Sequence, residues 1–186
     1  MPYKEVLLDT EQLKQIVSRL THEIASAFQD KNDCLALVVM DGAKYFADDL
    51  LAGLNIAIDV EYIKASSYKG TSSTGHVTIE DAQSLKDRIR GKNILLIDDI
   101  YDTGLTLSHI IQWLNEHNPQ SIQTCVLLEK RHKHDKIVNV DFIGTQIEDA
   151  FIVGYGLDFN GQYRELPCIG VLSDEIIRQN DPAYKS

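Results

Sequence analysis

The chain has 186 residues, of which 44% are hydrophobic and 25% charged, and its formal net charge is −10. This length allows one well-buried domain, and we expect a single domain over residues 1–186. The acidic balance repels polyanions and so disfavours general nucleic-acid binding, and no apolar run approaches the roughly 18 residues that a membrane span needs. Three scattered cysteines and the absence of a signal-peptide pattern favour a reduced, cytoplasmic protein.

The spacing of apolar residues predicts alternating helices and strands along most of the chain. In chain order, we expect a helix over residues 10–29 with Thr10 as its N-cap, a strand over 34–40, a helix over 45–54, a strand over 56–62, a polar loop over 66–75, a short strand over 76–80, a strand over 93–97, a helix over 106–116, and strands over 126–128 and 140–143. This alternation predicts an α/β fold with a mostly parallel sheet, in which ligands bind beyond the carboxyl ends of the strands. The last third of the chain, with strand-like runs at 151–158 and 169–172, is expected to form a small accessory cap.

The segment 94–107 carries the most informative motif and reads Ile-Leu-Leu-Ile-Asp-Asp-Ile-Tyr-Asp-Thr-Gly-Leu-Thr-Leu. A buried strand is predicted to end at Asp98 and Asp99, which cannot both point inward unless the chain turns there. The turn at 102–106 then leads into a helix, where Gly104 lets the backbone approach a ligand and free N–H groups form an anion nest. A phosphate suits this nest, and vicinal sugar hydroxyls suit the acidic pair.

This motif resembles the phosphoribosyl pyrophosphate motif of the type I phosphoribosyltransferases. The resemblance implies their fold, a mostly parallel central sheet flanked by helices with a small cap, or hood. It implies that Asp98 and Asp99 hold the ribose hydroxyls and help to organise a metal, and that Asp102 lies near the purine N7 as the general base. The loop that would cradle the 5-phosphate consists of Asp102, Thr103, Gly104, Leu105 and Thr106.

A second segment closely resembles the base-binding segment of the hypoxanthine-guanine phosphoribosyltransferases. It reads Phe-Ile-Val-Gly-Tyr-Gly-Leu-Asp-Phe from position 151, and Tyr-Arg-Glu-Leu-Pro follows at 163–167. The aromatic ring of Phe151 can stack on a flat base. The resemblance implies that the backbone of Ile152 meets the edge of the base and that Asp158 is a ligand of a second magnesium. It also implies that Arg164 contacts pyrophosphate, whose oxygens suit a guanidinium fork.

Lys130 stands 21 residues before Phe151, which is the spacing that the family shows. A lysine ammonium only donates hydrogen bonds. The 6-oxo group of hypoxanthine or guanine accepts such a bond, whereas the 6-amino group of adenine does not. Because an unmatched buried donor is costly, this lysine predicts discrimination against adenine of up to ~10⁴-fold.

Two short loops add to the resemblance, and one of them departs from it. Ser67 and Tyr68 resemble the start of the family's flexible catalytic loop, which closes over the reaction centre and excludes water. Asp41 and Gly42 match the position of the loop that holds pyrophosphate. Many members of the family have lysine or arginine where this chain has Asp41, which cannot supply that positive charge.

The resemblance as a whole implies an enzyme of purine salvage. It would use Mg²⁺ and transfer the phosphoribosyl group from phosphoribosyl pyrophosphate to hypoxanthine or guanine, giving IMP or GMP and pyrophosphate. The family further implies a homodimer or homotetramer, without a nucleic-acid or membrane partner. Three alternatives stay open: a different base range, either xanthine or hypoxanthine alone; an RNA-binding regulator, which the acidic charge disfavours; and a phosphoacceptor signalling domain, which leaves the 151–166 segment unexplained.

Overall fold

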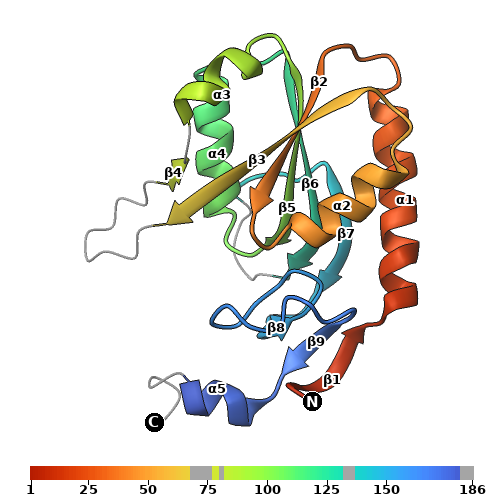
Figure 1. Ribbon diagram of the computed structural model, residues 1–186, viewed down its shortest axis with the longest axis vertical. Helices are drawn as coiled ribbons and strands as arrows, with labels where there is room; N and C mark the ends of the chain where they lie inside the picture. The colour runs from red at the N-terminus through yellow and green to blue at the C-terminus, as the bar shows by residue number, and fades with distance from the viewer. Residues whose placement is uncertain (68–76, 80–81, 132–136, 181–186) are drawn as a thin grey trace.

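The computed structural model describes residues 1–67, 77–79, 82–131 and 137–180. A six-stranded sheet with helices on both faces forms its larger part, and a three-stranded sheet lies beyond one end of the larger sheet (Figure 1). The elements are β1 Tyr3–Leu8, α1 Thr10–Phe28, β2 Cys34–Met40, α2 Lys44–Gly53, β3 Ile58–Ser67, β4 Val77–Ile79, α3 Ala82–Ile89, β5 Asn93–Tyr101, α4 Leu105–Asn115, β6 Ser121–Lys130, β7 Phe142–Ile147, β8 Ile152–Val153, β9 Ile169–Leu172 and α5 Asp174–Asn180. The α/β class is therefore confirmed.

The large sheet has the strand order β4-β3-β2-β5-β6-β7. Strands β3, β2, β5, β6 and β7 are parallel, and only β4 is antiparallel, to β3. From β2 the chain moves outward to β3, and it later returns to place β5 on the other side of β2. The carboxyl ends of β2 and β5 therefore form a topological switch point, which is where α/β sheets of this kind bind ligands.

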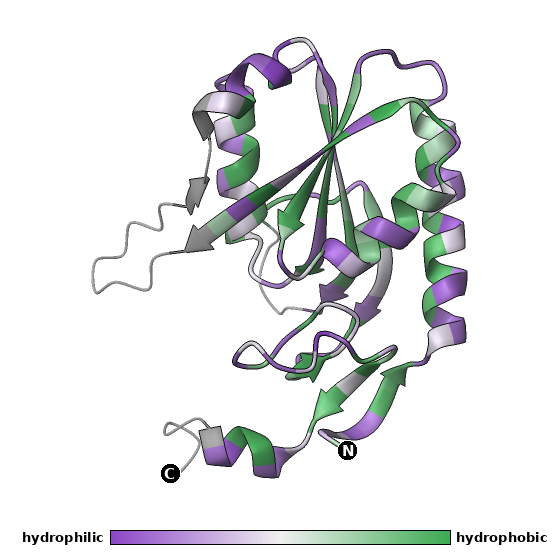
Figure 2. Ribbon diagram, in the orientation of Figure 1, coloured by the Kyte–Doolittle hydropathy of each residue, from purple (hydrophilic) through white to green (hydrophobic). Residues whose placement is uncertain are grey.

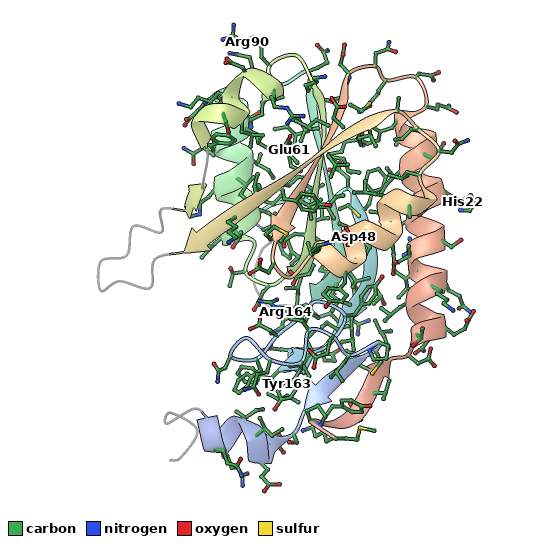
Figure 3. The ribbon with its side chains drawn as sticks, in the orientation of Figure 1. His22, Asp48, Glu61, Arg90, Tyr163 and Arg164 are labelled. Atoms are coloured by element: carbon green, nitrogen blue, oxygen red, sulfur yellow. The ribbon has the colours of Figure 1, made fainter. Side chains whose placement is uncertain are left out.

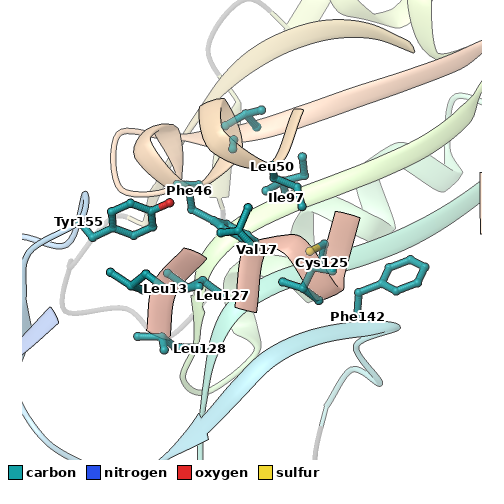
Figure 4. Close-up of a cluster of buried hydrophobic side chains, with 14 of the residues drawn as sticks. Leu13, Val17, Phe46, Leu50, Ile97, Cys125, Leu127, Leu128, Phe142 and Tyr155 are labelled. Atoms are coloured by element: carbon teal, nitrogen blue, oxygen red, sulfur yellow. The ribbon is translucent and has the colours of Figure 1, made fainter. Parts of the chain in front are cut away.

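Alternation along the central strands produces two cores, one on each face of the sheet. Ala36 and Val38 of β2 belong to the core under α1 and α2, whereas Leu35 and Leu37 belong to the core under α3 and α4. Both faces are apolar because helices cover both, as expected for a parallel sheet. Figure 2 shows green, hydrophobic stretches in the central strands, and Figure 4 shows side chains of the core beside α1 and α2.

The smaller sheet is the expected cap, with the antiparallel order β1-β9-β8. Its strands β8 and β9 come from the C-terminal third, as predicted. Strand β1 was not predicted and comes from the N-terminus, pairing Tyr3 with Leu172 and Leu8 with Ile169. Its register is irregular at two points, so the sequence of β1 lacks the clean alternation that marks a strand.

The first helix begins differently from our expectation. Thr10 was predicted as the N-cap, but the cap is Asp9, whose carboxylate accepts a hydrogen bond from the backbone N–H of Gln12 at 2.8 Å. The Gln12 side chain accepts one in return from the backbone N–H of Asp9 at 2.9 Å, which completes a capping box. The Thr10 hydroxyl instead donates to the carbonyl of Pro167 at 3.0 Å and so ties the helix to the cap.

Four strands of the large sheet differ from their predicted bounds, and helices α3 and α5 were not predicted. Strand β6 runs over Ser121–Lys130, whereas we expected 126–128, and β3 runs over Ile58–Ser67, whereas we expected 56–62. Strand β5 continues past Ile97 to Tyr101 because its pairing with β6 continues, so Asp98 and Asp99 lie inside the strand and not at its end. Strand β7 begins at Phe142, whereas we expected a strand over 140–143. Helix α3 was not predicted because its short sequence is mostly polar. Within the described ranges no helix is long and apolar enough to cross a membrane.

Candidate active site

The carboxyl ends of β2, β5 and β6 bring three of the predicted site segments to one edge of the sheet. Strand β2 ends at Met40, β5 at Tyr101 and β6 at Lys130. Tyr101 pairs with Glu129, so Asp102 leaves β5 beside the end of β6. The cap lies beyond this edge (Figure 1). The predicted loops therefore face a cap across the switch point of the sheet.

The turn after β5 has the shape that the motif predicted. Gly104 adopts the left-handed conformation, with φ at 81°, and is the N-cap of α4. A Cβ at this position would overlap the hydroxyl of Tyr101, so the close approach also requires glycine. The Thr103 hydroxyl accepts a hydrogen bond from the backbone N–H of Leu105 at 3.3 Å. The first N–H groups of a helix lack intrahelical partners, so Thr106 and its neighbours offer donors to an anion.

The acidic pair lies close to the turn, with Asp98 buried and Asp99 half-buried. The Asp98 side chain is 7% exposed and accepts a hydrogen bond from the backbone N–H of Asp99 at 2.9 Å. Burial raises the pKa of Asp98 well above its ordinary value, and the negative charge of Asp99 raises it further. Burial also raises the pKa of Asp99, although hydrogen bonds with the Asp98 side chain and with the backbone at Ile100, and lastly the charge of Arg164, oppose this shift. Hydroxyl donors or a cation would stabilise such a pair.

The loop after β2 packs directly on this acidic pair. The peptide bond between Met40 and Asp41 is cis. A Cβ at Gly42 would overlap the Asp99 carboxylate, so glycine is required for this close packing. The Asp41 side chain is exposed, and it places a negative charge where the family often has a positive one.

Lys130 is the last residue of β6, and its ammonium lies between two carboxylates. The Nζ atom is 2.8 Å from Asp149 Oδ1 and 3.5 Å from Asp102 Oδ2. The Lys130 side chain is only 14% exposed, so this ammonium is the most enclosed member of the cluster. The sequence reasoning predicted that Lys130 and Asp102 share one site, and the structure brings them together.

The predicted base-binding segment crosses the cap. Phe151 is 47% exposed, and its ring meets the edge of Phe159 with the ring centres 6.4 Å apart. Ile152 is buried in β8 and pairs with Val171 of β9, so its backbone position is fixed. Lys130, Asp149 and Phe151 line one cavity of about 310 Å³.

Asp158 and Arg164 form an ion pair at the boundary between the cap and the large sheet, where Figure 3 shows Arg164. The Nη2 atom of Arg164 lies 2.8 Å from Asp158 Oδ1, and its Nη1 donates to the carbonyl of Gly156 at 2.6 Å. The other Asp158 oxygen accepts from the backbone N–H of Gly161 at 2.6 Å. A Cβ at Gly156 would overlap the carbonyl of Gly42, so this part of the cap touches the loop after β2.

One predicted segment falls mostly outside the described residues. Ser67 is the last residue of β3, which extends further into the expected polar loop than we predicted. Tyr68 and the rest of the predicted catalytic loop lie outside the described residues. The short returning strand is present as β4 and pairs with the end of β3.

The sequence did not point to two acids with contacts in or near this site. Asp149 holds Lys130, and Asp49 of α2 accepts a 2.5 Å hydrogen bond from the hydroxyl of Tyr155 and so joins α2 to the cap. Neither acid stands in a motif. The signal for Asp149 was its position two residues before Phe151, which places it beside a base-binding segment.

Comparisons with known proteins give the same family as the motifs. The family model described as a phosphoribosyl transferase domain matches residues 4–160. A hypoxanthine-guanine-xanthine phosphoribosyltransferase of Tritrichomonas foetus is 36% identical over 176 residues, covering 93% of each chain. A hypoxanthine phosphoribosyltransferase of Escherichia coli is 37% identical over 175 residues, covering 92% of this chain and 97% of the relative.

Solved structures agree with these sequence relatives. A hypoxanthine phosphoribosyltransferase of Staphylococcus aureus is similar with a TM-score of 0.82 and 32% identity, over 94% of each chain. A Trypanosoma cruzi hypoxanthine phosphoribosyl transferase gives a TM-score of 0.85 at 29% identity, over 95% of each chain. The fold is therefore the type I phosphoribosyltransferase fold, and the chain belongs to the hypoxanthine-guanine phosphoribosyltransferase family, transferases of purine salvage.

Proposed function

We propose that this chain transfers the phosphoribosyl group of phosphoribosyl pyrophosphate to hypoxanthine or guanine, forming IMP or GMP and releasing pyrophosphate. The observation that carries the proposal is the position of Lys130, whose ammonium lies 3.5 Å from Asp102. A donor for a 6-oxo group therefore stands beside an acceptor for a purine ring proton. Both adjoin the phosphate-binding turn, so a base and a phosphoribosyl group would meet at this point.

The sugar and its phosphate have matching groups in the turn after β5. Backbone N–H groups at the start of α4, with the hydroxyls of Thr103 and Thr106, would hold the 5-phosphate. Asp98 and Asp99 would accept hydrogen bonds from the two ribose hydroxyls. Such bonds stabilise the ionised carboxylates and so oppose the increase in pKa that burial causes. Pyrophosphate would lie near Gly42 and Arg164.

The base has its own set of contacts on the cap and on β6. Phe151 would stack on one face of the purine, and the backbone of Ile152 would meet its edge. Lys130 would donate to the 6-oxo group. These contacts would fix the base with N9 toward C1 of the ribose, so that binding supplies orientation as well as affinity.

The residues present fit a magnesium ion that arrives with the substrate. Among the described residues, no three His, Cys, Asp or Glu side chains form a group that could hold a metal alone. Mg²⁺ is usually bound by one or two carboxylates together with substrate phosphates, so such a group is not needed. Asp158, and the pair Asp98 and Asp99, would be the protein's oxygen ligands. Bound Mg²⁺ would supply charge stabilisation for the pyrophosphate oxygens.

In the reaction, the bond between C1 and the pyrophosphate oxygen breaks, and the bond between C1 and N9 forms. Positive character develops at C1 while negative charge leaves with pyrophosphate, and Arg164 would stabilise that charge. The ring proton that the purine must lose would pass to Asp102. The cap would exclude water and so suppress hydrolysis at C1.

The proposal is tested by a spectrophotometric assay with phosphoribosyl pyrophosphate, Mg²⁺ and each of hypoxanthine, guanine, xanthine and adenine. We expect turnover with hypoxanthine and guanine, and turnover with adenine that is slower by up to about 10⁴-fold. Relatives differ in the bases that their names give, so the xanthine result defines the base range of this chain. Turnover with none of the four bases would overturn the proposal and would bring back the RNA-binding alternative, which a gel-shift with RNA tests directly.

We also propose a homodimer or homotetramer in the cytoplasm. Tyr45 and Tyr62 are 41% and 48% exposed, and exposed aromatic side chains are enriched at protein interfaces. The similar Trypanosoma cruzi structure is described in terms of its oligomeric state, which supports an oligomer here. All three cysteines are free and buried, as suits a reducing compartment. Light scattering after size-exclusion chromatography would measure the mass, and a monomer would contradict the proposed oligomer.

A further inference from the structure

Lys130 contacts two carboxylates, and each belongs to a residue that follows one of the two strands flanking β6. Asp102 follows β5, in which Tyr101 pairs with Glu129 of β6. Asp149 follows β7, in which Ile147 pairs with Lys130 itself. The three side chains therefore meet at the carboxyl edge of the sheet because of its strand order, although Lys130 and Asp149 are 19 residues apart in sequence.

The two carboxylates hold the ammonium unequally. Asp149 accepts a hydrogen bond at 2.8 Å, whereas Asp102 lies at 3.5 Å, which is an ion-pair distance and is too long for a good hydrogen bond. Lys130 is 14% exposed, while Asp102 and Asp149 are 50% and 74% exposed. The ammonium is thus enclosed and directed by the closer of two partners.

The proposed function gives Lys130 and Asp102 roles that conflict if the two bind each other. Lys130 must present its protons to a 6-oxo oxygen, and Asp102 must present a lone pair to a purine ring proton. A tight ion pair between them would occupy both groups. A second acid that holds Lys130 more closely would prevent this, because the ammonium would stay in place when Asp102 turns to the base.

We propose that Asp149 is a positioning residue that aims the Lys130 ammonium at the base, through the shorter of the two carboxylate contacts of Lys130. Asp149 lines the same cavity as Lys130 and Phe151, so it acts at the edge of the site where the base would bind. This inference rests on the proposed function and adds a residue to it that no motif contains.

The test compares Asp149→Asn with Glu148→Gln. Glu148 is the adjacent acid and forms a matching ion pair, with Arg131 Nη1 at 2.9 Å, but it does not touch Lys130. Each substitution removes one negative charge from the same turn, so general electrostatic or folding effects are shared. Steady-state kinetics would be measured with hypoxanthine, adenine and phosphoribosyl pyrophosphate, and thermal unfolding would confirm that each variant is folded.

We expect Asp149→Asn to lower kcat/KM for hypoxanthine roughly tenfold, because the amide can still accept a hydrogen bond from the ammonium but lacks the negative charge that makes this bond strong. The preference for hypoxanthine over adenine should fall, while KM for phosphoribosyl pyrophosphate should change less than about twofold, because Asp149 acts on the base side of the site. Glu148→Gln should behave as the unmodified chain, and Asp149→Glu should recover part of the loss.

A double-mutant cycle separates positioning from a merely structural role. Once Lys130→Gln has removed the ammonium, adding Asp149→Asn should cause no further loss beyond about twofold. Fully additive losses would overturn the inference, as would an Asp149→Asn variant that matches Glu148→Gln. If the unmodified chain turns over hypoxanthine and the Asp149 variants have the same kinetic constants, this inference alone is refuted. If the unmodified chain is inactive, the proposed function is refuted as well.

Discussion

The hydroxyl of Tyr155 donates a 2.5 Å hydrogen bond to the Asp49 carboxylate, and this bond joins the cap to helix α2. Burial, followed by the hydrogen bond to Asp49, raises the pKa of the Tyr155 phenol, so the hydroxyl keeps its proton at neutral pH. Figure 4 shows the Tyr155 ring beside Phe46 at the edge of the core. The next residue, Gly156, contacts the carbonyl of Gly42. One side chain therefore anchors the stretch of cap that touches the proposed pyrophosphate loop.

Replacing Tyr155 with phenylalanine should weaken this anchor without opening the core. The variant keeps the buried ring and loses only the hydroxyl, so we expect a loss of about 1 kcal/mol in the free energy of unfolding, measured in urea. Because Arg164 donates to the carbonyl of Gly156, we also expect KM for phosphoribosyl pyrophosphate to rise severalfold while KM for hypoxanthine holds.

Tyr62→Phe is the matched control for this prediction. The Tyr62 hydroxyl donates to the neighbouring acid Asp48, but the distance is 3.4 Å and the ring is 48% exposed. A long, solvated hydrogen bond contributes little, so this variant should keep the stability and KM of the unmodified chain. Equal effects of the two substitutions would show that the bond between Tyr155 and Asp49 does not hold the cap in place.

Gly42→Ala tests the packing of the pyrophosphate loop on the acidic pair. The added methyl group would overlap the Asp99 carboxylate, so either the loop or Asp99 must move. We expect kcat/KM for phosphoribosyl pyrophosphate to fall by about 10-fold or more, since small displacements in a site can cost up to about 100-fold. Gly53→Ala adds the same group at the end of α2, where it would meet Thr21 Cγ2 at 3.1 Å, and it should leave activity unchanged. Normal kinetics for Gly42→Ala would show that this contact is not needed.

The raised pKa of Asp98 predicts how stability depends on pH in the metal-free chain. A carboxylate whose pKa is raised in the folded state binds its proton more tightly there than in the unfolded chain. The folded state therefore loses stability as pH rises from the ordinary pKa of a carboxyl group through the raised pKa, because the buried group becomes charged. Asp98→Asn removes that cost. In EDTA, the melting temperature of Asp98→Asn should therefore exceed that of the unmodified chain near neutral pH, and the difference should shrink in acid.

Asp30→Asn provides the control, because Asp30 is an exposed acid beyond the end of α1. Its effect on the melting temperature should be small at every pH. The Asp98 variant should also lose activity, since a neutral amide accepts ribose hydroxyls less strongly than a carboxylate does. A melting temperature for Asp98→Asn below that of the unmodified chain at neutral pH would contradict a destabilising buried charge.

The parts of the site that the sequence could predict are local in the chain. The turn from Asp102 to Thr106 follows a strand directly, so one segment specifies the strand, the left-handed Gly104 and the start of α4. The parts that it could not predict depend on pairing between distant segments. Tyr155 and Asp49 are 106 residues apart, and the sequence around either one gives no sign of the other.

The same distinction explains the differences in the fold. The buried parallel strand β2 is a continuous apolar run and was predicted with its observed bounds, whereas only the apolar centre of β6 was predicted. Strand β1 was missed because its residues are mostly exposed and it forms only by pairing with β9 at the other end of the chain. The choice of Asp9 over Thr10 as the helix cap follows from the local capping box between Asp9 and Gln12, and the Thr10 hydroxyl bonds to Pro167 instead. A tertiary contact therefore decided β1, whereas a local one decided the cap.

Asp102→Asn isolates proton transfer from binding. The amide keeps the size of the side chain and can still accept a hydrogen bond, but it cannot take up the purine proton. We expect kcat with hypoxanthine to fall by about 10²- to 10⁴-fold, as for the loss of a general base. KM for hypoxanthine should change little, because Asp149 still holds Lys130 at 2.8 Å after Asp102 loses its charge. Glu148→Gln, which removes a nearby charge outside the cluster, should leave both constants unchanged. If kcat for Asp102→Asn stays high, another group must accept the proton, and a rise in KM alone would assign Asp102 to binding.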